Sequence, residues 1–182
     1  MAGTYMNTVA NYNKLLFGGP VGSGKTTAIS SIADAAPVST EAPLSTGPMG
    51  DKTDTTVAMD YSTLTLDEHT VHLFGLPGQQ RFAFMRDILV PGSFGVVLLL
   101  DASSDEIYAN ASEWLTSLRG LDSGLKFAIG VTKTELEKSV NFSLNRLRGV
   151  VREHTPTAPV LSVDARSAQD IKQLIRVLLH MK

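Results

Sequence analysis

A glycine-rich stretch at residues 19–26 constrains the fold of this 182-residue chain more than any other feature. It reads GPVGSGKT, which satisfies GxxxxGK(S/T), and it lies between an apolar, β-favouring run and a segment of helical period. Gly19, Gly22 and Gly24 allow a tight turn in which successive N–H groups point inward at a helix N-terminus. Lys25 then reaches the β and γ phosphates, and the Thr26 hydroxyl binds Mg²⁺. The stretch predicts a cradle for a nucleoside triphosphate.

Short apolar runs alternate with segments of helical period along the rest of the chain. This alternation predicts the α/β class: a P-loop NTPase fold whose six-stranded, mostly parallel sheet has one antiparallel strand and helices on both faces. Asp67, Glu68 and His69 form a turn too short for a crossover helix, so the second and third strands are expected to be an antiparallel hairpin. The length favours one domain over residues 1–182. The strands are expected at residues 14–18, 56–66, 70–75, 94–101, 126–131 and 159–163.

Apolar periodicity predicts the helices that cover this sheet. The first is expected from Gly24 to about Ala35. Another is expected to begin at Ser103 or Ser104, because Asp105 and Glu106 then complement the helix dipole in its first turn. Two later helices carry stripes expected to face the core: Val140, Leu144, Leu147 and Val151, and then Ile171, Leu174, Ile175, Leu178 and Leu179.

The segment APVSTEAPLSTGPMGDKTD, residues 36–54, resists assignment. It has three prolines, two glycines and many Ser and Thr residues, and it shows no periodicity. A loop of this length in a compact domain is usually functional or disordered. We therefore expect a long loop here.

Composition excludes several classes of protein. The formal net charge of −2 gives no general attraction to nucleic acid or anionic membranes, so no nucleic-acid partner is expected. The chain has no cysteine, which agrees with a cytoplasmic location and excludes thiol chemistry. Its longest apolar run, residues 94–100, is far below the ~20 residues that cross a bilayer, so no membrane-spanning segment is expected.

Two further motifs resemble the small GTPases of the Ras superfamily in the expected order. TVAMDY, residues 56–61, resembles the start of the second strand in Rab-type members, and GQQRF, residues 78–82, resembles the signature GQERF. The resemblance implies the Ras-like form of the fold. It also implies that Thr56 closes on Mg²⁺ and the γ phosphate, that the Gly78 amide meets that phosphate, and that Gln79 orients the attacking water. Gln79, Lys25 and Thr56 are the expected catalytic residues.

A closer resemblance covers FGGPVGSGKTTAI and LFGLPGQQRFAFMRD. These stretches are similar to prokaryotic small GTPases of the MglA, CvnD and MfpB type, which carry Pro before the Gly-Gln pair. The resemblance implies a regulatory partner of the roadblock/LC7 type.

The base-binding residues depart from the superfamily pattern. TKTE, residues 132–135, stands where guanine-specific members carry NKxD, and the Glu135 carboxylate has the acceptor oxygens that a guanine edge needs. A polar helix entry is the alternative reading of TKTELEK. The last base contact is expected at DAR, residues 164–166, with Ser162 marking a competing register. The expected nucleotide contacts are Gly19, Val21, Gly22, Ser23, Gly24, Lys25, Thr26, Thr27, Gly78, Thr132, Lys133, Glu135, Asp164, Ala165 and Arg166.

Gly75 stands where the superfamily carries an aspartate that holds Mg²⁺ through water. The ion is therefore expected to depend on Thr26, Thr56 and the phosphates. Asp54 and Asp101 are candidate replacements. Arg81 and Arg86 follow the Gly-Gln pair, where solvation or partner contact is the expected role for each.

These features favour a GTP-binding switch that hydrolyses GTP slowly to GDP with Mg²⁺. Slow hydrolysis is expected because the segment before Thr56 carries no arginine. Two alternatives remain open at this point: a nucleotide-binding module with negligible hydrolysis, and an ATP-using P-loop enzyme.

Overall fold

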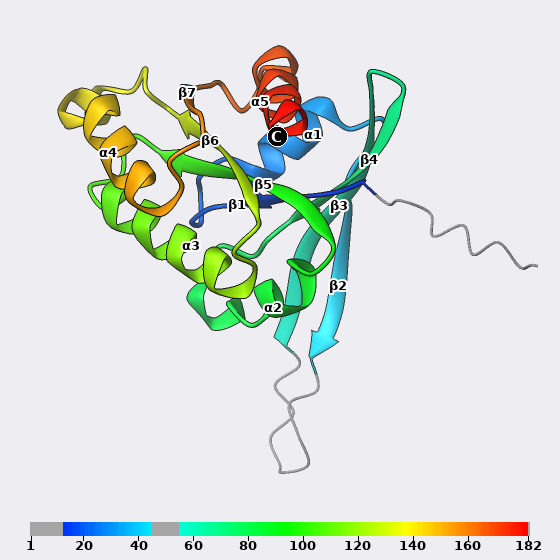
Figure 1. Ribbon diagram of the computed structural model, residues 1–182. Coiled ribbons are helices and arrows are strands. Elements are labelled where there is room, and N and C mark those ends of the chain that lie inside the picture. The colour runs from blue at the N-terminus through cyan, green and yellow to red at the C-terminus, as the bar shows by residue number, and fades with distance from the viewer. Residues whose placement is uncertain (1–12, 45–54, 182) are drawn as a thin grey trace, which may run out of the picture.

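Residues 13–44 and 55–181 are described by a computed structural model, which forms one seven-stranded sheet with helices on both faces (Figure 1). The strand order is β2-β3-β4-β1-β5-β6-β7, and β3 runs antiparallel to both of its neighbours. The elements are β1 (Asn13–Gly18), α1 (Lys25–Ile32), β2 (Val38–Leu44), β3 (Thr55–Leu66), β4 (His69–Gly75), η1 (Gln80–Phe82), α2 (Met85–Leu89), β5 (Ser93–Asp101), α3 (Ile107–Leu121), β6 (Lys126–Thr132), η2 (Glu137–Asn141), α4 (Leu144–His154), β7 (Val160–Ser162) and α5 (Ala168–His180).

The core lies in two layers, one on each face of the sheet. Leu15 and Phe17 of β1 pack in the layer that contains α1 and α5, whereas Leu16 packs in the layer that contains α2, α3 and α4. This alternation follows from the period of two in a strand. It confirms the predicted α/β P-loop fold, because central strands buried on both faces need helices on both sides.

The predicted hairpin between β3 and β4 forms, but its turn holds only Asp67 and Glu68, because His69 belongs to β4. Asp67 and Glu68 have φ values of 47° and 67°, which fits a two-residue turn with both central residues left-handed. Leu66 then pairs with His69, and Tyr61 pairs with Phe74. The turn therefore fixes which residues of β3 and β4 lie opposite each other.

The sheet has a seventh strand where a long loop was expected. Val38–Leu44 forms β2 and pairs antiparallel with β3, with Pro43 opposite Thr56. An edge strand tolerates proline because one of its sides makes no ladder hydrogen bonds. Residues 45–54 of the expected loop lie outside the described part of the chain.

Two expected helix features are wrong. Ser103 and Ser104 are not the start of a helix, because both bond back to Asp101 in a turn, and α3 begins only at Ile107. Val140 is not a core residue: it lies in η2 and is 82% exposed, whereas Leu147 and Val151 of α4 are buried. The first helix is also shorter than expected, ending at Ile32.

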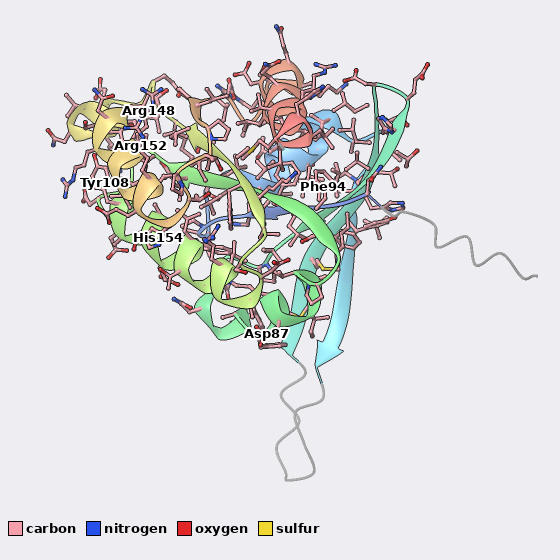
Figure 2. All side chains as sticks on the ribbon, viewed as in Figure 1. Asp87, Phe94, Tyr108, Arg148, Arg152 and His154 are labelled. Atoms are coloured by element: carbon pink, nitrogen blue, oxygen red, sulfur yellow. The ribbon has the colours of Figure 1, made fainter. Side chains whose placement is uncertain are left out.

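The helices α3 and α4 lie side by side on one face of the sheet, and Figure 2 labels Tyr108 on α3 and His154 on α4. Ser112 and His154 join the two helices through a 2.9 Å contact between Oγ and Nε2. In the described residues, none of the helices combines the length and apolar character that a membrane span requires.

Candidate functional site

The loop between β1 and α1 has the backbone of a phosphate cradle. Gly19 has a φ of 135°, and a Cβ there would lie 2.1 Å from the carbonyl oxygen of Leu99, so a side chain cannot be accommodated. Gly24 has a φ of 98° directly before α1, which favours glycine. Both glycines of the motif are therefore required by geometry, and they turn the chain into the N-terminus of α1.

Lys25 lies across this loop. Its Nζ donates to the carbonyl oxygens of Gly19 and Pro20, both at 2.7 Å. Burial lowers the pKa of Lys25 to about 8; the negative charge of Asp60 raises it, and the positive charge of Arg86 lowers it further. The ammonium group is thus held at the cradle in a position that favours an anionic ligand.

Asp60 of β3 supplies the carboxylate that Gly75 lacks. The Thr26 hydroxyl donates to Asp60 Oδ2 at 2.5 Å. A Cβ on Gly75 would lie 3.2 Å from Asp60 Cβ and 3.4 Å from Asp60 Oδ2, so the neighbouring strand fills the space above the glycine. Asp60 thus places a carboxylate beside Thr26 from β3, next to the glycine of β4.

Sequence reasoning missed Asp60, although a signal for it exists. Counting back from the hairpin turn, the pairs Leu66–His69 and Tyr61–Phe74 place Asp60 beside Gly75. Of the two suggested replacements, Asp101 accepts from Lys133 Nζ at 2.5 Å and is thus engaged elsewhere, whereas Asp54 lies outside the described residues and stays a prediction. Burial raises the pKa of Asp101, but hydrogen bonds from Lys133 and Ser103 outweigh it and lower the pKa overall.

Thr26 and Asp60 fit a magnesium ion. Their oxygens meet at the helix end of the cradle, and Mg²⁺ prefers oxygen ligands and commonly binds through one or two protein groups plus phosphates. Among the side chains that the structure describes, no group of three or more His, Asp or Glu residues could enclose a metal ion. The side chain of Thr56, the other expected ligand, lies outside the described part of the structure.

The segment after β4 lies directly on the cradle. A Cβ on Gly78 would be 2.6 Å from the amide nitrogen of Val21 and 3.0 Å from Lys25 Nζ. Gln79 follows it and is exposed, with Oε1 accepting from Arg81 Nε at 2.7 Å. The structure therefore brings Gly78 against the cradle, and Gln79 is the next residue of the chain.

The predicted base loop is tied to the cradle by side chains. The Thr132 hydroxyl donates to the Ser23 carbonyl at 3.1 Å, and Lys133 Nζ donates to the Gly22 carbonyl at 2.8 Å. Lys133 adopts a φ of 60°, which turns the chain away from β6. These bonds hold Thr132 and Lys133 against the cradle, while the turn that follows leads into η2, so the base loop and the helix entry both stay predictions.

A pocket of about 280 Å³ opens beside these bonds. Two predicted base segments meet there, since Glu135 comes from the loop after β6 and Ala165 from the loop after β7. Ala165 also packs against the cradle, because a Cβ on Gly24 would lie 3.0 Å from its Cβ. The lining residues are Gly24, Thr27, Thr132, Lys133, Glu135, Leu136, Asp164, Ala165 and Arg166.

Arg166 engages the two acidic residues of this pocket unequally. It binds Asp164 through Nε at 2.9 Å and Nη2 at 2.8 Å, but its Nη2 lies 3.8 Å from Glu135 Oε1. The hydrogen bond from Arg166 holds the pKa of Asp164 at about 2. The carboxylate of Glu135 is therefore the less engaged acceptor at the edge of the pocket.

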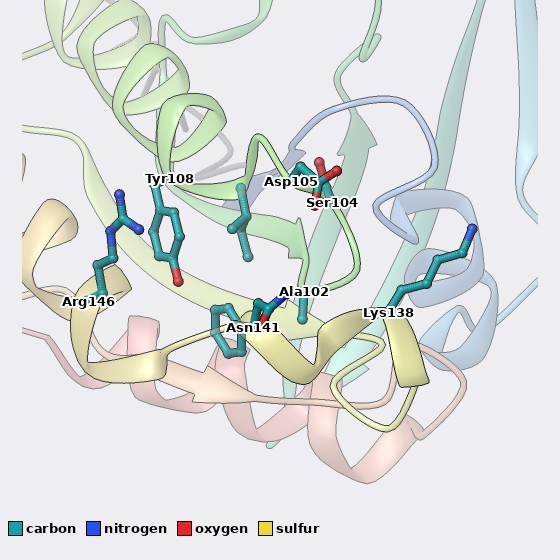
Figure 3. A pocket seen from close by; sticks show the side chains of 9 residues that line it. Ala102, Ser104, Asp105, Tyr108, Lys138, Asn141 and Arg146 are labelled. Carbon is teal, nitrogen blue, oxygen red and sulfur yellow. The ribbon is translucent and has the colours of Figure 1, made fainter.

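A second cavity, of about 210 Å³, lies between the start of α3 and η2 (Figure 3). The Arg146 guanidinium stacks on the Tyr108 ring, 4.1 Å from its centroid, and the Tyr108 hydroxyl accepts from the Ser143 amide. This cavity shares no lining residue with the base pocket.

Arg81 is exposed as expected, but the expectation for Arg86 is wrong. Arg86 is 2% exposed, because its guanidinium packs on the ring of Trp114 from α3. The helix α2 is too short to show a clear apolar stripe, so the sequence does not indicate this burial.

A family model for conserved hypothetical ATP binding proteins matches residues 17–181. The matched range includes the cradle, Asp60 and the base pocket. The uncharacterized protein MJ1339 of Methanocaldococcus jannaschii is 46% identical to the chain over 48 residues, which are 26% of this chain and 31% of that protein. The chain thus matches under a third of that relative's length.

The family match corrects the resemblance drawn from the motifs. Assignment to the small GTPases of the MglA, CvnD and MfpB type is wrong, and the roadblock/LC7-type partner that it implied loses its basis. The resemblance rested on short motifs around the phosphate site, and one fold can host many different functions around such a site. The chain belongs to the family of conserved hypothetical ATP-binding proteins and is a nucleotide-binding P-loop protein.

Proposed function

We propose that the chain hydrolyses GTP to GDP and phosphate with Mg²⁺, and that its two nucleotide states differ in the Gly78–Gln79 segment. The contact between Gly78 and the cradle carries this proposal. It puts Gly78 beside Lys25, where the terminal phosphate of a bound triphosphate would lie, and Gln79 is the next residue of the chain. A diphosphate lacks that group, so only the triphosphate would hold the segment.

Thr26 and Asp60 are the residues that would hold the magnesium ion. When bound, Mg²⁺ neutralises charge on the phosphoryl oxygens. Thr26 faces the cradle from the first turn of α1, and Asp60 orients its hydroxyl through their hydrogen bond. The positions of these two side chains support a metal-dependent reaction despite the glycine at position 75.

Gln79 is the residue proposed to orient the attacking water. Its Oε1 is engaged by Arg81 Nε at 2.7 Å, so this bond has to break before the amide can hold a water at the phosphate. Lys25 and the Gly78 amide would stabilise charge on the terminal phosphate. The competing bond to Arg81 supports slow hydrolysis.

Replacement of Gln79 by alanine tests this assignment. We expect the single-turnover rate of GTP hydrolysis to fall on the order of 10²-fold, because the water loses its orienting group. The affinity for GTP is expected to stay within about threefold, since no binding energy is assigned to this side chain. Gln80→Ala is the matched control, because Gln80 is exposed and bonds to Glu113 of α3 instead. Equal rates in wild type and Gln79→Ala would remove Gln79 from the mechanism.

The carboxylate of Glu135 supports guanine as the base. A guanine edge presents two neighbouring donors, N1–H and the 2-amino group, and a carboxylate accepts both. An adenine edge presents one donor beside an acceptor, N1, which a carboxylate repels. The backbone N–H of Ala165 lies in the same pocket, and the described residues contain no acceptor for it, so it suits the guanine O6.

ATP is the second candidate substrate, because the family description names ATP. Glu135→Gln distinguishes the two bases. If Glu135 reads guanine, the variant loses about 10- to 100-fold in affinity for GTP, since one acceptor of a charge-assisted pair becomes a donor. Asp164→Asn is the control, because Arg166 already occupies that carboxylate. Competition binding against ATP gives the readout, and unchanged GTP affinity in Glu135→Gln argues against guanine reading by this residue.

A further inference from the structure

Arg86 is buried in a place where an apolar side chain would pack at lower cost. Of the described residues, it is the one charged residue among the buried polar side chains, all others being Ser or Thr. It lies on α2, seven positions after Gln79, and faces α3 across the layer that also contains Leu89. Its presence therefore needs a reason other than core packing.

The contacts of Arg86 do not compensate its charge. The guanidinium carbon lies 3.7 Å from the centroid of the Trp114 ring, and Nη1 donates to Ser117 Oγ at 2.9 Å. The buried Nε has no hydrogen-bond partner within the described residues. Burial lowers the pKa of Arg86, and only the negative charge of Glu113 raises it. A buried cation without a paired carboxylate destabilises a fold, so stability does not explain this residue.

The position of Arg86 links it to the phosphate cradle. Trp114, on which it stacks, also touches the base of the cradle, because a Cβ on Gly18 would lie 3.3 Å from Cζ3 of its ring. The Arg86 guanidinium therefore stacks on the ring that lies against the last residue before the cradle, and its buried positive charge would attract an anion bound there.

We infer that Arg86 is a positioning residue for the terminal phosphate: its buried charge, held on Trp114 behind the cradle, favours a triphosphate over a diphosphate and fixes the segment that carries Gln79. This inference rests on the proposed hydrolysis and names a residue that regulates the same site. Binding of a triphosphate places an additional negative charge near Arg86, and the attraction offsets the unfavourable free energy of burying the guanidinium. The chain then has its own positive charge near the reaction without an arginine in the segment before Thr56.

Arg86→Met tests the inference, because it keeps the length of the side chain and removes the charge. Affinity is measured for GDP and for the non-hydrolysable GTP analogue with an imido group between the β and γ phosphates. The variant is expected to lose about tenfold more affinity for the analogue than for GDP, while its melting temperature without nucleotide stays equal or rises. Arg86→Lys keeps the charge and is expected to retain most of the contrast between the two ligands.

Trp114 provides a spectroscopic readout, because it is the one tryptophan of the chain. Its emission is expected to change when the analogue binds to the wild type and to change less in Arg86→Met. Ser117→Ala is the control for a merely structural role of Arg86. It removes the hydrogen bond from Arg86 Nη1 to Ser117 Oγ but leaves the charge of Arg86 in place. The inference is overturned if Arg86→Met loses equal affinity for GDP and for the GTP analogue. It is also overturned if Arg86→Lys loses the difference in affinity between these two ligands as Arg86→Met does. If the wild-type protein binds the analogue but hydrolyses no GTP, the proposed hydrolysis is wrong. The difference in affinity between the analogue and GDP still tests the role of Arg86 in that case.

Discussion

Replacement of Lys25 by methionine is expected to weaken GTP binding by at least about 10²-fold, because each charge-assisted bond to phosphate contributes about 1.5–3 kcal/mol. The same change removes a buried ammonium group whose pKa is about 8 in the folded protein, against 10.5 in the free side chain. The substitution therefore has two opposite effects. It lowers the affinity for GTP, and it stabilises the nucleotide-free protein at neutral pH by removing a charge that is costly to bury.

The sign of the pH effect follows from the direction of this shift. Between pH 8 and 10.5 the unfolded chain keeps the Lys25 proton while the folded chain loses it, so this group makes the protein more stable as pH rises through that window. The stability of Lys25→Met relative to wild type is thus expected to fall by about 2–3 kcal/mol between pH 7 and pH 10. Urea unfolding without nucleotide measures it. A constant difference across that range would contradict the buried charge. Lys138→Met, at an exposed lysine outside the cradle, is the control for both readouts.

The second large effect is expected from changes to the carboxylate of Asp60 on β3 and to Gly75 beside it on β4. Asp60→Ala is expected to lower the rate of GTP hydrolysis roughly 10- to 100-fold and to raise the Mg²⁺ concentration needed for half-maximal rate, because Thr26 loses its orienting acceptor. In the double variant Asp60→Gly with Gly75→Asp, the acid returns to β4. Removing the Asp60 side chain frees most of the space that the new carboxylate needs, since the one other close atom is Ile29 Cδ1, the end of a side chain, at 3.3 Å.

The double variant is expected to recover at least part of the lost rate and of the Mg²⁺ affinity. Gly75→Asp alone is the control, because it crowds two carboxylates within 3.2 Å at their Cβ atoms and is expected to impair the protein. Titration of hydrolysis with Mg²⁺ measures all three variants. An Asp60→Ala protein with an unchanged Mg²⁺ titration would show that Asp60 has no part in holding the ion.

The parts of the site that follow from local sequence were predictable. The cradle is contiguous in the chain, and its glycines, lysine and threonine have fixed spacing, so motif and geometry agree at Gly19, Gly24 and Lys25. The base pocket was predictable from two short segments that follow strands, because parallel strands end at one edge of a sheet. The turn at Asp67 and Glu68 followed from its length.

The missed features depend on contacts between distant segments. Asp60 comes to lie beside Gly75 only through the register of β3 against β4, and a search for contiguous motifs does not reveal that register. Counting residues back from the hairpin turn does reveal it. Arg86 is buried because Trp114, on α3, covers it, and nothing near Arg86 in the chain indicates that partner. The strand β2 has a polar, proline-containing sequence, and it forms because backbone pairing with β3 at the sheet edge needs no apolar periodicity.

The identity and fate of the bound nucleotide test the central claim most directly. The purified protein would be loaded with radiolabelled GTP or ATP, freed of excess ligand, given Mg²⁺ and followed through one turnover by chromatography. We predict that GTP is retained in preference to ATP and is converted slowly to GDP with release of one phosphate, and that EDTA stops the conversion. Retention and turnover of ATP in place of GTP, or retention of GTP that stays intact with Mg²⁺, would contradict the account.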